Sequence, residues 1–239
     1  MKKILLIVLF ISVGFSQELI RGEYINTEGG ITIFYYKETQ NKVLRVKSVG
    51  YHENGQKYRE ETYKDGEMIG WTSWNYYYNG QMESETTYYV YDKDWKKDGL
   101  WTYWYKNGQK RSERTYKDGE LDGLNRVWYE NGQKSTEVTY KDGKEDGLWT
   151  MWPQDGKEKS ELIIKDGKRD GLYTIWFENG QKKEERTYKD GKRDGLWTWW
   201  YDYGQKKREN TYKDDKSFSS KCWDEDGNEC ECRYRGGCQ

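Results

Sequence analysis

Few residue types in this sequence could do chemistry: one histidine, four cysteines, a recurring glutamate and a row of tryptophans. His52 is the only histidine, and it occupies the slot that Tyr105 fills in a later repeat, so we expect a strand residue rather than a base or a ligand. The sequence contains no nucleophile–base motif, no phosphate-binding glycine loop and no histidine-rich metal motif. It therefore predicts a protein that is not an enzyme, with no catalytic residues, no metal and no cofactor.

A glutamate recurs once per repeat, and two interpretations of it differ in chemistry. It could be a solvated partner in a cross-strand pair, worth about 0.2–1 kcal/mol, or one of a row of acidic ligands for a cation. Carboxylates two strands apart are separated by roughly 9–10 Å, which is too far to share one ion. We therefore predict cross-strand partners. The positions are Glu60, Glu85, Glu113, Glu137, Glu161, Glu185 and Glu209.

A row of tryptophans could form a binding surface. Exposed indoles at regular spacing could stack on sugar rings, much as the aromatic repeats of choline-binding cell-wall proteins hold their ligand. The alternative is that these rings cover the sheet and pack on lysine and arginine neighbours. The row consists of Trp104, Trp128, Trp152, Trp176 and Trp200.

All four cysteines lie near the C-terminus, at Cys222, Cys230, Cys232 and Cys238. An even number of cysteines in an exported chain indicates disulfides. Zinc is the alternative, but this spacing is not that of a standard zinc knuckle. A three-residue loop at 226–228 would set Cys222 opposite Cys232 and leave Cys230 for Cys238. We expect residues 214–239 to form a disulfide-stapled end cap.

The elements that must position these residues are tandem repeats. An Asn-Gly-Gln marker, or a substitute for it, returns every 24 residues from Gly108 to Gly204, and Lys-Asp-Gly and Asp-Gly-Leu markers recur between its copies. Aromatic and β-branched runs such as 100–105 are typical of strands, and glycines every dozen residues argue against helices. We predict an all-β protein in which each repeat of about 24 residues over 51–213 supplies two antiparallel strands.

Alternation along the strands sorts the side chains onto two faces if Asn-Gly forms a two-residue hairpin, in which both turn residues have positive φ. One face then holds Leu100, Thr102, Trp104, Glu113 and Thr115, with the recurring glutamate opposite a threonine in most repeats. We expect the opposite face, which we call the aromatic face, to be buried or half-buried. It holds Trp101, Tyr103, Tyr105 and Tyr116, and equivalents Trp149, Met151, Pro153 and Ile164; Tyr173, Ile175, Phe177 and Tyr188; and Trp197, Trp199, Tyr201 and Tyr212.

Composition excludes several classes of protein. The 239 residues are 35% charged and 17% aromatic, with a formal net charge of −1. Disordered chains are poor in aromatic residues, so disorder is excluded. Nucleic-acid binding needs a basic stripe that displaces counterions, and the balanced charge argues against it.

The N-terminal segment differs from the rest. Lys2 and Lys3 precede an apolar run over 4–13, and small residues precede Gln17. This pattern predicts a signal peptide over 1–16, and the run is shorter than the roughly 20 residues of a membrane anchor. The alternative is a buried N-terminal strand. We expect export to the periplasm, cell surface or medium without a transmembrane anchor, and an N-terminal β cap over 17–50 with strands at 31–36 and 43–49.

The run from Tyr188 to Trp197, Y-K-D-G-K-R-D-G-L-W, precedes an aromatic strand, and in sister repeats this strand is followed by Asn-Gly-Gln. It resembles the MORN repeat, and most closely the bacterial variant found in YwqK-family antitoxins. The resemblance implies an elongated, twisted antiparallel sheet that serves as a binding or scaffolding surface, without catalytic residues. An exported chain could not neutralise a cytoplasmic toxin, so any immunity role would lie in the envelope. The typical MORN histidine is replaced by Asp122, Asp146, Asp170 and Asp194.

Together these observations predict about sixteen strands, spaced by roughly 4.8 Å, in a sheet about 75–80 Å long. We expect an exported, non-enzymatic repeat protein that binds a protein partner or acts as a scaffold, because tryptophan and tyrosine are enriched at interfaces. The runner-up is a carbohydrate- or cell-wall-binding module that uses the tryptophan row.

Overall fold

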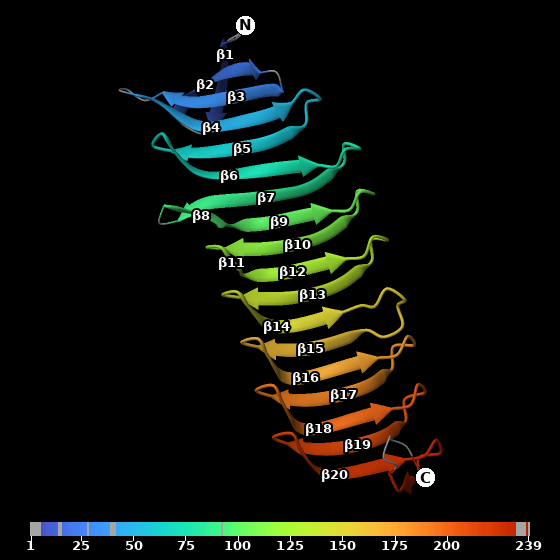
Figure 1. Cartoon of the computed structure of the whole chain (residues 1–239). Coiled ribbons are helices and arrows are strands. Elements are labelled where there is room, and N and C mark those ends of the chain that lie inside the picture. The colour runs from blue at the N-terminus through green and yellow to red at the C-terminus, as the bar shows by residue number, and fades with distance from the viewer. Residues whose placement is uncertain are drawn as a thin grey trace. The chain divides into compact units, whose positions relative to one another are not determined.

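The computed structural model describes residues 6–13, 16–27, 29–38, 42–91, 93–232 and 238. These residues form 21 strands and no helix, and the strands belong to one open antiparallel sheet (Figure 1). The predicted all-β fold of tandem two-stranded repeats is confirmed. Sixteen of these strands are the expected ones; β1, β2 and the short strands β8, β11 and β21 are additional.

The chain divides into two compact units, residues 1–109 with 115–120, and residues 110–114 with 121–239. In the first unit each strand from β1 to β7 pairs with the next strand in the chain, and β7 pairs with both β8 and β9. Its strands are β1 (Leu6–Val13), β2 (Ser16–Thr27), β3 (Gly30–Glu38), β4 (Val43–His52), β5 (Lys57–Lys64), β6 (Glu67–Tyr76), β7 (Met82–Tyr91), β8 (Asp94–Lys97) and β9 (Gly99–Trp104).

The N-terminal segments form strands in this unit. The two strands expected at 31–36 and 43–49 lie within β3 and β4. Residues 6–13 form β1, which pairs with β2 along its whole length. Residues 1–5, 14 and 15 lie outside the described residues, and the signal peptide stays a prediction.

The second unit continues the same pattern, and β10 and β11 contribute residues to both units. From β12 to β21 each strand pairs with its neighbour in sequence, and β12 also pairs with β10. The strands are β10 (Lys110–Lys117), β11 (Glu120–Leu121), β12 (Gly123–Trp128), β13 (Lys134–Lys141), β14 (Lys144–Met151), β15 (Ser160–Lys165), β16 (Lys168–Trp176), β17 (Lys182–Lys189), β18 (Lys192–Trp200), β19 (Lys206–Lys213), β20 (Lys216–Trp223) and β21 (Glu229–Cys230).

The two-residue hairpin turns are formed by Asp-Gly, not by Asn-Gly. Asp190 and Gly191 have φ of 48° and 86°, and Lys189 pairs with Lys192 across the turn. Positive φ at both central residues defines a type I′ turn, whose twist matches the flanking strands. Aspartate tolerates this left-handed region better than most residues because its short side chain forms local hydrogen bonds.

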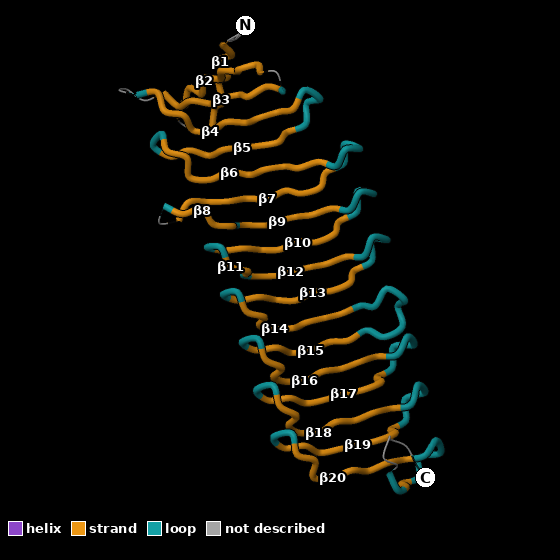
Figure 2. The backbone as a smooth tube through the Cα atoms, viewed as in Figure 1, coloured by secondary structure: helices purple, strands orange, loops and turns teal. Residues whose placement is uncertain are grey.

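The expectation of a two-residue Asn-Gly hairpin was wrong. In the loop at Gly132 the Tyr129 N–H donates to the Gln133 carbonyl at 2.8 Å, and the Gly132 N–H donates to the Tyr129 carbonyl at 2.9 Å. Three residues therefore form the loop, and only its glycine has positive φ, of 84°. Asn131 Oδ1 accepts a hydrogen bond from the Gln133 N–H at 3.0 Å. These loops line one end of the strands and the Asp-Gly turns line the other (Figure 2).

A β-bulge beside each Asn-Gly loop corrects the register. Trp128 pairs with Lys134, but Val127 pairs with Thr136, so Ser135 is the extra residue. The bulge offsets the longer loop, and the expected opposition of glutamate and threonine is confirmed. The pairs across these loops are Thr150–Glu161, Thr174–Glu185 and Thr198–Glu209. On the other side, the threonine of the following hairpin lies opposite the glutamate in Glu85–Thr102, Glu137–Thr150, Glu161–Thr174 and Glu185–Thr198.

The aromatic face contains most of the core, as predicted. In the second unit Trp197 is 8% exposed; its ring centroid lies 5.3 Å from that of Tyr188 and 4.9 Å from that of Tyr212. The Trp197 indole N–H donates to the Thr187 carbonyl at 3.0 Å. The buried members of this face are Trp101, Tyr116, Ile164, Tyr188, Trp197 and Tyr212.

One member of this face departs from expectation, because Met151 is 39% exposed. It is the last residue of β14, beside the loop that contains Pro153. Trp199 is only half-buried. The centre of the aromatic face is therefore buried, whereas the positions near the Asn-Gly loops are partly open.

The cysteine cap joins Cys222 to Cys232 and Cys230 to Cys238, with Cα separations of 5.3 and 5.4 Å. This pairing agrees with the prediction. The expected backbone register was wrong, because Cys222 lies opposite Cys230. The loop begins one residue earlier than expected: Asp224 donates its N–H to the Asn228 carbonyl at 3.0 Å, which leaves residues 225–227 in the loop.

Replacing Trp197 with alanine is expected to destabilise the protein by about 3–5 kcal/mol, because it removes a buried ring from between Tyr188 and Tyr212. The same change at the half-buried Trp199 is expected to cost less. Urea unfolding of both variants measures the difference. Equal losses for the two would contradict the burial of this face.

Reduction of the two disulfides is expected to free four thiols and to loosen only the end of the second unit, since repeats in an array are stabilised by their nearest neighbours. Amide hydrogen exchange before and after reduction measures where protection is lost. Mass spectrometry that found four unmodified thiols in the native protein would reject the cap and favour zinc.

Candidate binding surface

One face of the second unit carries three parallel rows across its strands, and we call it the leucine–tryptophan face. Every strand of the unit belongs to the sheet, so no second layer of described residues covers this face. The leucine row is Leu148, Ile163, Leu172 and Leu196; the threonine–glutamate row is Thr150, Glu161, Thr174, Glu185, Thr198 and Glu209; and the lysine–tryptophan row is Trp128, Lys134, Trp152, Lys159, Trp176, Lys182, Trp200, Lys206 and Trp223.

The bulge makes the lysine–tryptophan row possible. Residues three apart on a regular strand point to opposite faces. The bulge at Ser135 turns Lys134 and Glu137 to the same face, where the lysine Nζ lies 3.0 Å from Glu137 Oε2. The same Nζ lies 5.0 Å from the ring centroid of Trp152 in the next hairpin. Each lysine thus joins its own glutamate to a tryptophan of the following repeat.

The arrangement recurs in five hairpins of the second unit. In each, a lysine ammonium contacts the recurring glutamate and lies within 5.9 Å of a tryptophan centroid one repeat further on. The sets are Lys110, Glu113 and Trp128; Lys134, Glu137 and Trp152; Lys159, Glu161 and Trp176; Lys182, Glu185 and Trp200; and Lys206, Glu209 and Trp223.

The predicted tryptophan row is therefore real, and its members are half-buried. Four of the five, Trp128, Trp152, Trp176 and Trp200, have a lysine ammonium over the indole. The backbone of Trp152 also contacts the neighbouring repeat, because its carbonyl accepts a hydrogen bond from the Tyr129 hydroxyl at 2.9 Å. These contacts favour the interpretation that the rings pack on their lysine neighbours over the interpretation that they await sugars.

The glutamates are less solvated than expected. Glu113 is 8% exposed, and Arg126 bridges it to Glu137, with contacts of 3.4 and 2.9 Å. Burial raises the pKa of Glu137, but hydrogen bonds from Lys134 and Arg126 outweigh burial and hold that pKa below its usual value. Among the described residues no group of three or more acidic, histidine or cysteine side chains is placed to hold a metal ion.

The aspartates that replace the MORN histidine link successive Asp-Gly turns. Asp146 Oδ2 accepts the Asp166 N–H at 3.4 Å, and Asp170 Oδ2 accepts the Asp190 N–H at the same distance. Lys213 Nζ lies 2.8 Å from Asp194. The sequence shows the aspartates but not these hydrogen bonds, because each acceptor and its donor are 20 residues apart.

The leucine row is the feature that sequence reasoning missed. Leu148, Leu172 and Leu196 are 50%, 44% and 44% exposed, and Ile163, opposite Leu148, is 41% exposed. The recurring Asp-Gly-Leu marker was a signal that could have revealed it. The same position of three successive repeats therefore exposes an aliphatic side chain.

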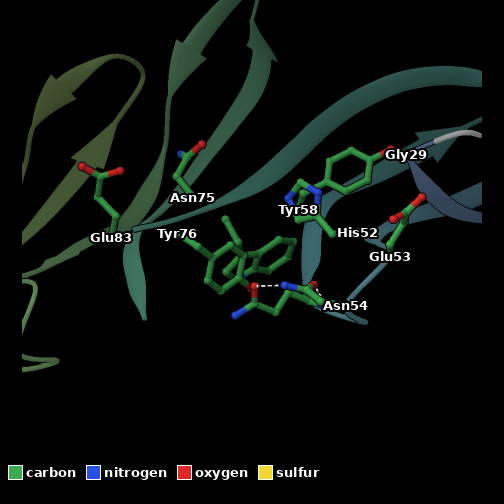
Figure 3. Close-up of a pocket in the computed structure, with 10 residues that line it drawn as sticks. Gly29, His52, Glu53, Asn54, Tyr58, Asn75, Tyr76 and Glu83 are labelled. Carbon is green, nitrogen blue, oxygen red and sulfur yellow. Dashed lines mark hydrogen bonds between the residues drawn. The ribbon is translucent and has the colours of Figure 1, made fainter. Parts of the chain in front are cut away.

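Each unit also has an open pocket beside its Asn-Gly loops. The pocket in the first unit, of about 770 Å³, is lined by His52, Tyr58, Trp74 and Tyr76, with Glu53 and Glu83 to either side (Figure 3). The pocket in the second unit, of about 570 Å³, has rings of Phe177, Trp199 and Tyr201 beside Lys183, Lys207 and Arg208.

His52 is a strand residue, as predicted. It ends β4, and its N–H donates to the Gln56 carbonyl at 2.8 Å, as the Tyr105 N–H does to Gln109. Its ring packs against Tyr58, with centroids 4.9 Å apart. The backbone N–H of each residue closes an Asn-Gly loop, so His52 and Tyr105 occupy equivalent positions in their repeats.

Five segments of the chain match the MORN repeat variant: residues 47–65, 97–118, 121–142, 169–190 and 193–214. The fold and the matches agree that the array consists of MORN-like repeats. No curated protein matches the chain. In the described part of the chain there is no helix of the length and apolarity that a membrane crossing requires.

The Lys134–Glu137–Arg126 contacts predict a pH dependence of stability. The folded pKa of Glu137 lies below that of the unfolded chain, so its ionised form stabilises the fold above the unfolded value, about pH 4.3. This contribution is lost as the pH falls through the folded pKa. Urea unfolding of wild type and Glu137→Gln is expected to show a difference at pH 7 that shrinks at pH 3. A difference independent of pH would contradict the ionic contacts.

Proposed function

We propose that this chain is an exported, non-enzymatic binding or scaffold protein whose leucine–tryptophan face docks a protein partner. The observation that carries the proposal is the leucine row, in which Leu148, Leu172 and Leu196 recur once per repeat and are exposed. Contiguous exposed apolar side chains rimmed by polar ones are typical of protein–protein contact sites.

The chemistry of the face supports a protein partner. The charged groups of the lysine–tryptophan row are paired within and between repeats, so they hold the sheet rather than wait for a substrate. The leucines have no such use. The exposed leucines alternate along their row with Thr187 and Thr211, which lie opposite Leu172 and Leu196. Repeat arrays offer extended binding surfaces of this kind.

Export is supported by two features. The charged and apolar N-terminal segment has the composition of a signal peptide. Two disulfides close the C-terminal cap, and disulfides form and persist in oxidising compartments. An immunity role like that of the antitoxins would then require a partner in the envelope or outside the cell.

Affinity capture from envelope extract, with residues 17–239 as bait, tests the docking face. We expect one specific protein to bind wild type and to be lost from the double variant Leu172→Glu and Leu196→Glu. Gln133→Glu with Gln181→Glu is the matched control, because it adds the same charge at exposed loop positions. Equal capture by all three proteins would contradict the proposed face.

Tryptophan fluorescence titration with cell-wall and matrix glycans tests the runner-up. We expect no saturable change. A saturable signal that disappears in Trp152→Ala and Trp176→Ala would replace the protein partner with a carbohydrate.

Export predicts a mature chain that begins at Gln17. N-terminal sequencing of the protein recovered from the native host measures this directly. An intact N-terminus in the cytoplasmic fraction would reject the exported location. The docking face would still be judged by the capture experiment.

A further inference from the structure

One hairpin of the first unit lacks the lysine that the five sets described above share. Aligned on the Asn-Gly loop, the three positions are Met82 and Glu85 on β7 and Trp104 on β9. Methionine carries no charge, so this hairpin has the glutamate and the tryptophan of the set without the ammonium that joins them.

The backbone of this hairpin is otherwise that of the complete sets. The register shifts between Asn75 and Tyr76, which provides the same bulge. Glu85 lies opposite Thr102, as Glu137 lies opposite Thr150. The Tyr77 hydroxyl donates to the Trp104 carbonyl at 2.8 Å, as the Tyr129 hydroxyl does to Trp152 at 2.9 Å. Glu85 and Trp104 are therefore held in the positions that a lysine joins elsewhere.

No described cation of the same unit joins Glu85 to Trp104. Among the described residues Glu85 forms no ion pair, and no cation lies over the Trp104 ring. Lys57, which is close enough to sense the charge of Glu85, is bonded to Glu60 at 3.0 Å and lies 4.6 Å from the Trp74 centroid.

The neighbouring pocket adds to the negative charge. Glu83 is the bulged residue of the same hairpin, and Glu53 lies on the far side of the pocket (Figure 3). Neither carboxylate forms an ion pair within the described residues. A group that approaches this part of the first unit thus meets several carboxylates and the half-buried indole of Trp104.

We propose that the slot between Glu85 and Trp104 binds a lysine side chain of a protein partner, an inference that rests on the proposed protein-binding function. Four of the complete sets have their lysine three residues before the glutamate, as Met82 is before Glu85, and they show that this geometry accepts an ammonium between a carboxylate and an indole. In the fifth set Lys159 reaches Glu161 from two residues before it. A carboxylate gives a charge-assisted hydrogen bond, and an indole is the best aromatic face for a cation. Within the partner's interface, the lysine would fix the position of this hairpin.

The slot is tested by following the indole N–H signals of the purified full chain by NMR during titration with acetyl-Ala-Lys-Ala-amide. Acetyl-Ala-norleucine-Ala-amide, which lacks the ammonium, is the control peptide. We expect a saturable shift at Trp104 with the lysine peptide only, and no such shift at Trp152, where Lys134 fills the equivalent slot.

Two reciprocal variants sharpen the test. Met82→Lys is expected to fill the slot from within and to weaken the peptide at Trp104 by about tenfold or more, whereas Met82→Leu keeps the wild-type affinity. Lys134→Met is expected to open a second slot and to produce a saturable shift at Trp152. The Lys134→Met result stands even if Met82→Lys fails to fold.

Equal shifts at all tryptophans, no saturable shift at Trp104, or binding unchanged by Met82→Lys would overturn the proposal. The titration needs no natural partner, so its failure would leave the leucine-row docking to be judged by the capture experiment. Loss of capture by the leucine variants with an intact lysine titration would conversely support both inferences.

Discussion

The β-bulge beside each Asn-Gly loop is the constraint on which the rest of the structure depends. It absorbs the extra residue of a three-residue loop and so keeps Glu185 opposite Thr174 and Glu209 opposite Thr198. It also turns Lys134 toward Glu137, three residues away on the same strand, and toward Trp152 of the next repeat. In a strand without the bulge, a lysine at this position would point to the opposite face.

The two faces of the second unit are stabilised by different contacts. On the aromatic face the rings pack across strands in tilted pairs, and guanidinium groups cover them, as Arg186 covers Trp197 at 5.0 Å. On the leucine–tryptophan face, lysine ammonium groups link carboxylates to indoles. Both kinds of contact join each repeat to the next, as in other repeat arrays, and the leucine row stays exposed.

Because the hairpins of this chain share one pattern, the hairpin that differs from it is informative. Five hairpins show what a lysine does between a glutamate and a tryptophan, and the hairpin with Met82 keeps the other two residues and the same hydrogen bonds. In a protein without repeats, an uncovered indole near an unpaired glutamate would carry little information. Here the complete sets of the same chain define the missing group as an ammonium.

Sequence pattern was enough to predict the strands and the two-stranded repeat, because these follow from alternation and glycine spacing. The glutamate–threonine pairs and the disulfide pairing were also predicted correctly, although from turn registers that the structure corrects. The tertiary structure decided which glycine turn is tight. Asn-Gly and Asp-Gly share the same local preference for positive φ, and only the Asp-Gly turn donates its glycine N–H to the preceding repeat, as Gly191 does to Arg169. It also decided the burial of Glu113, the exposure of Met151 and the lysine–tryptophan contacts. Each of these depends on a neighbour about one repeat away, beyond the reach of local sequence pattern.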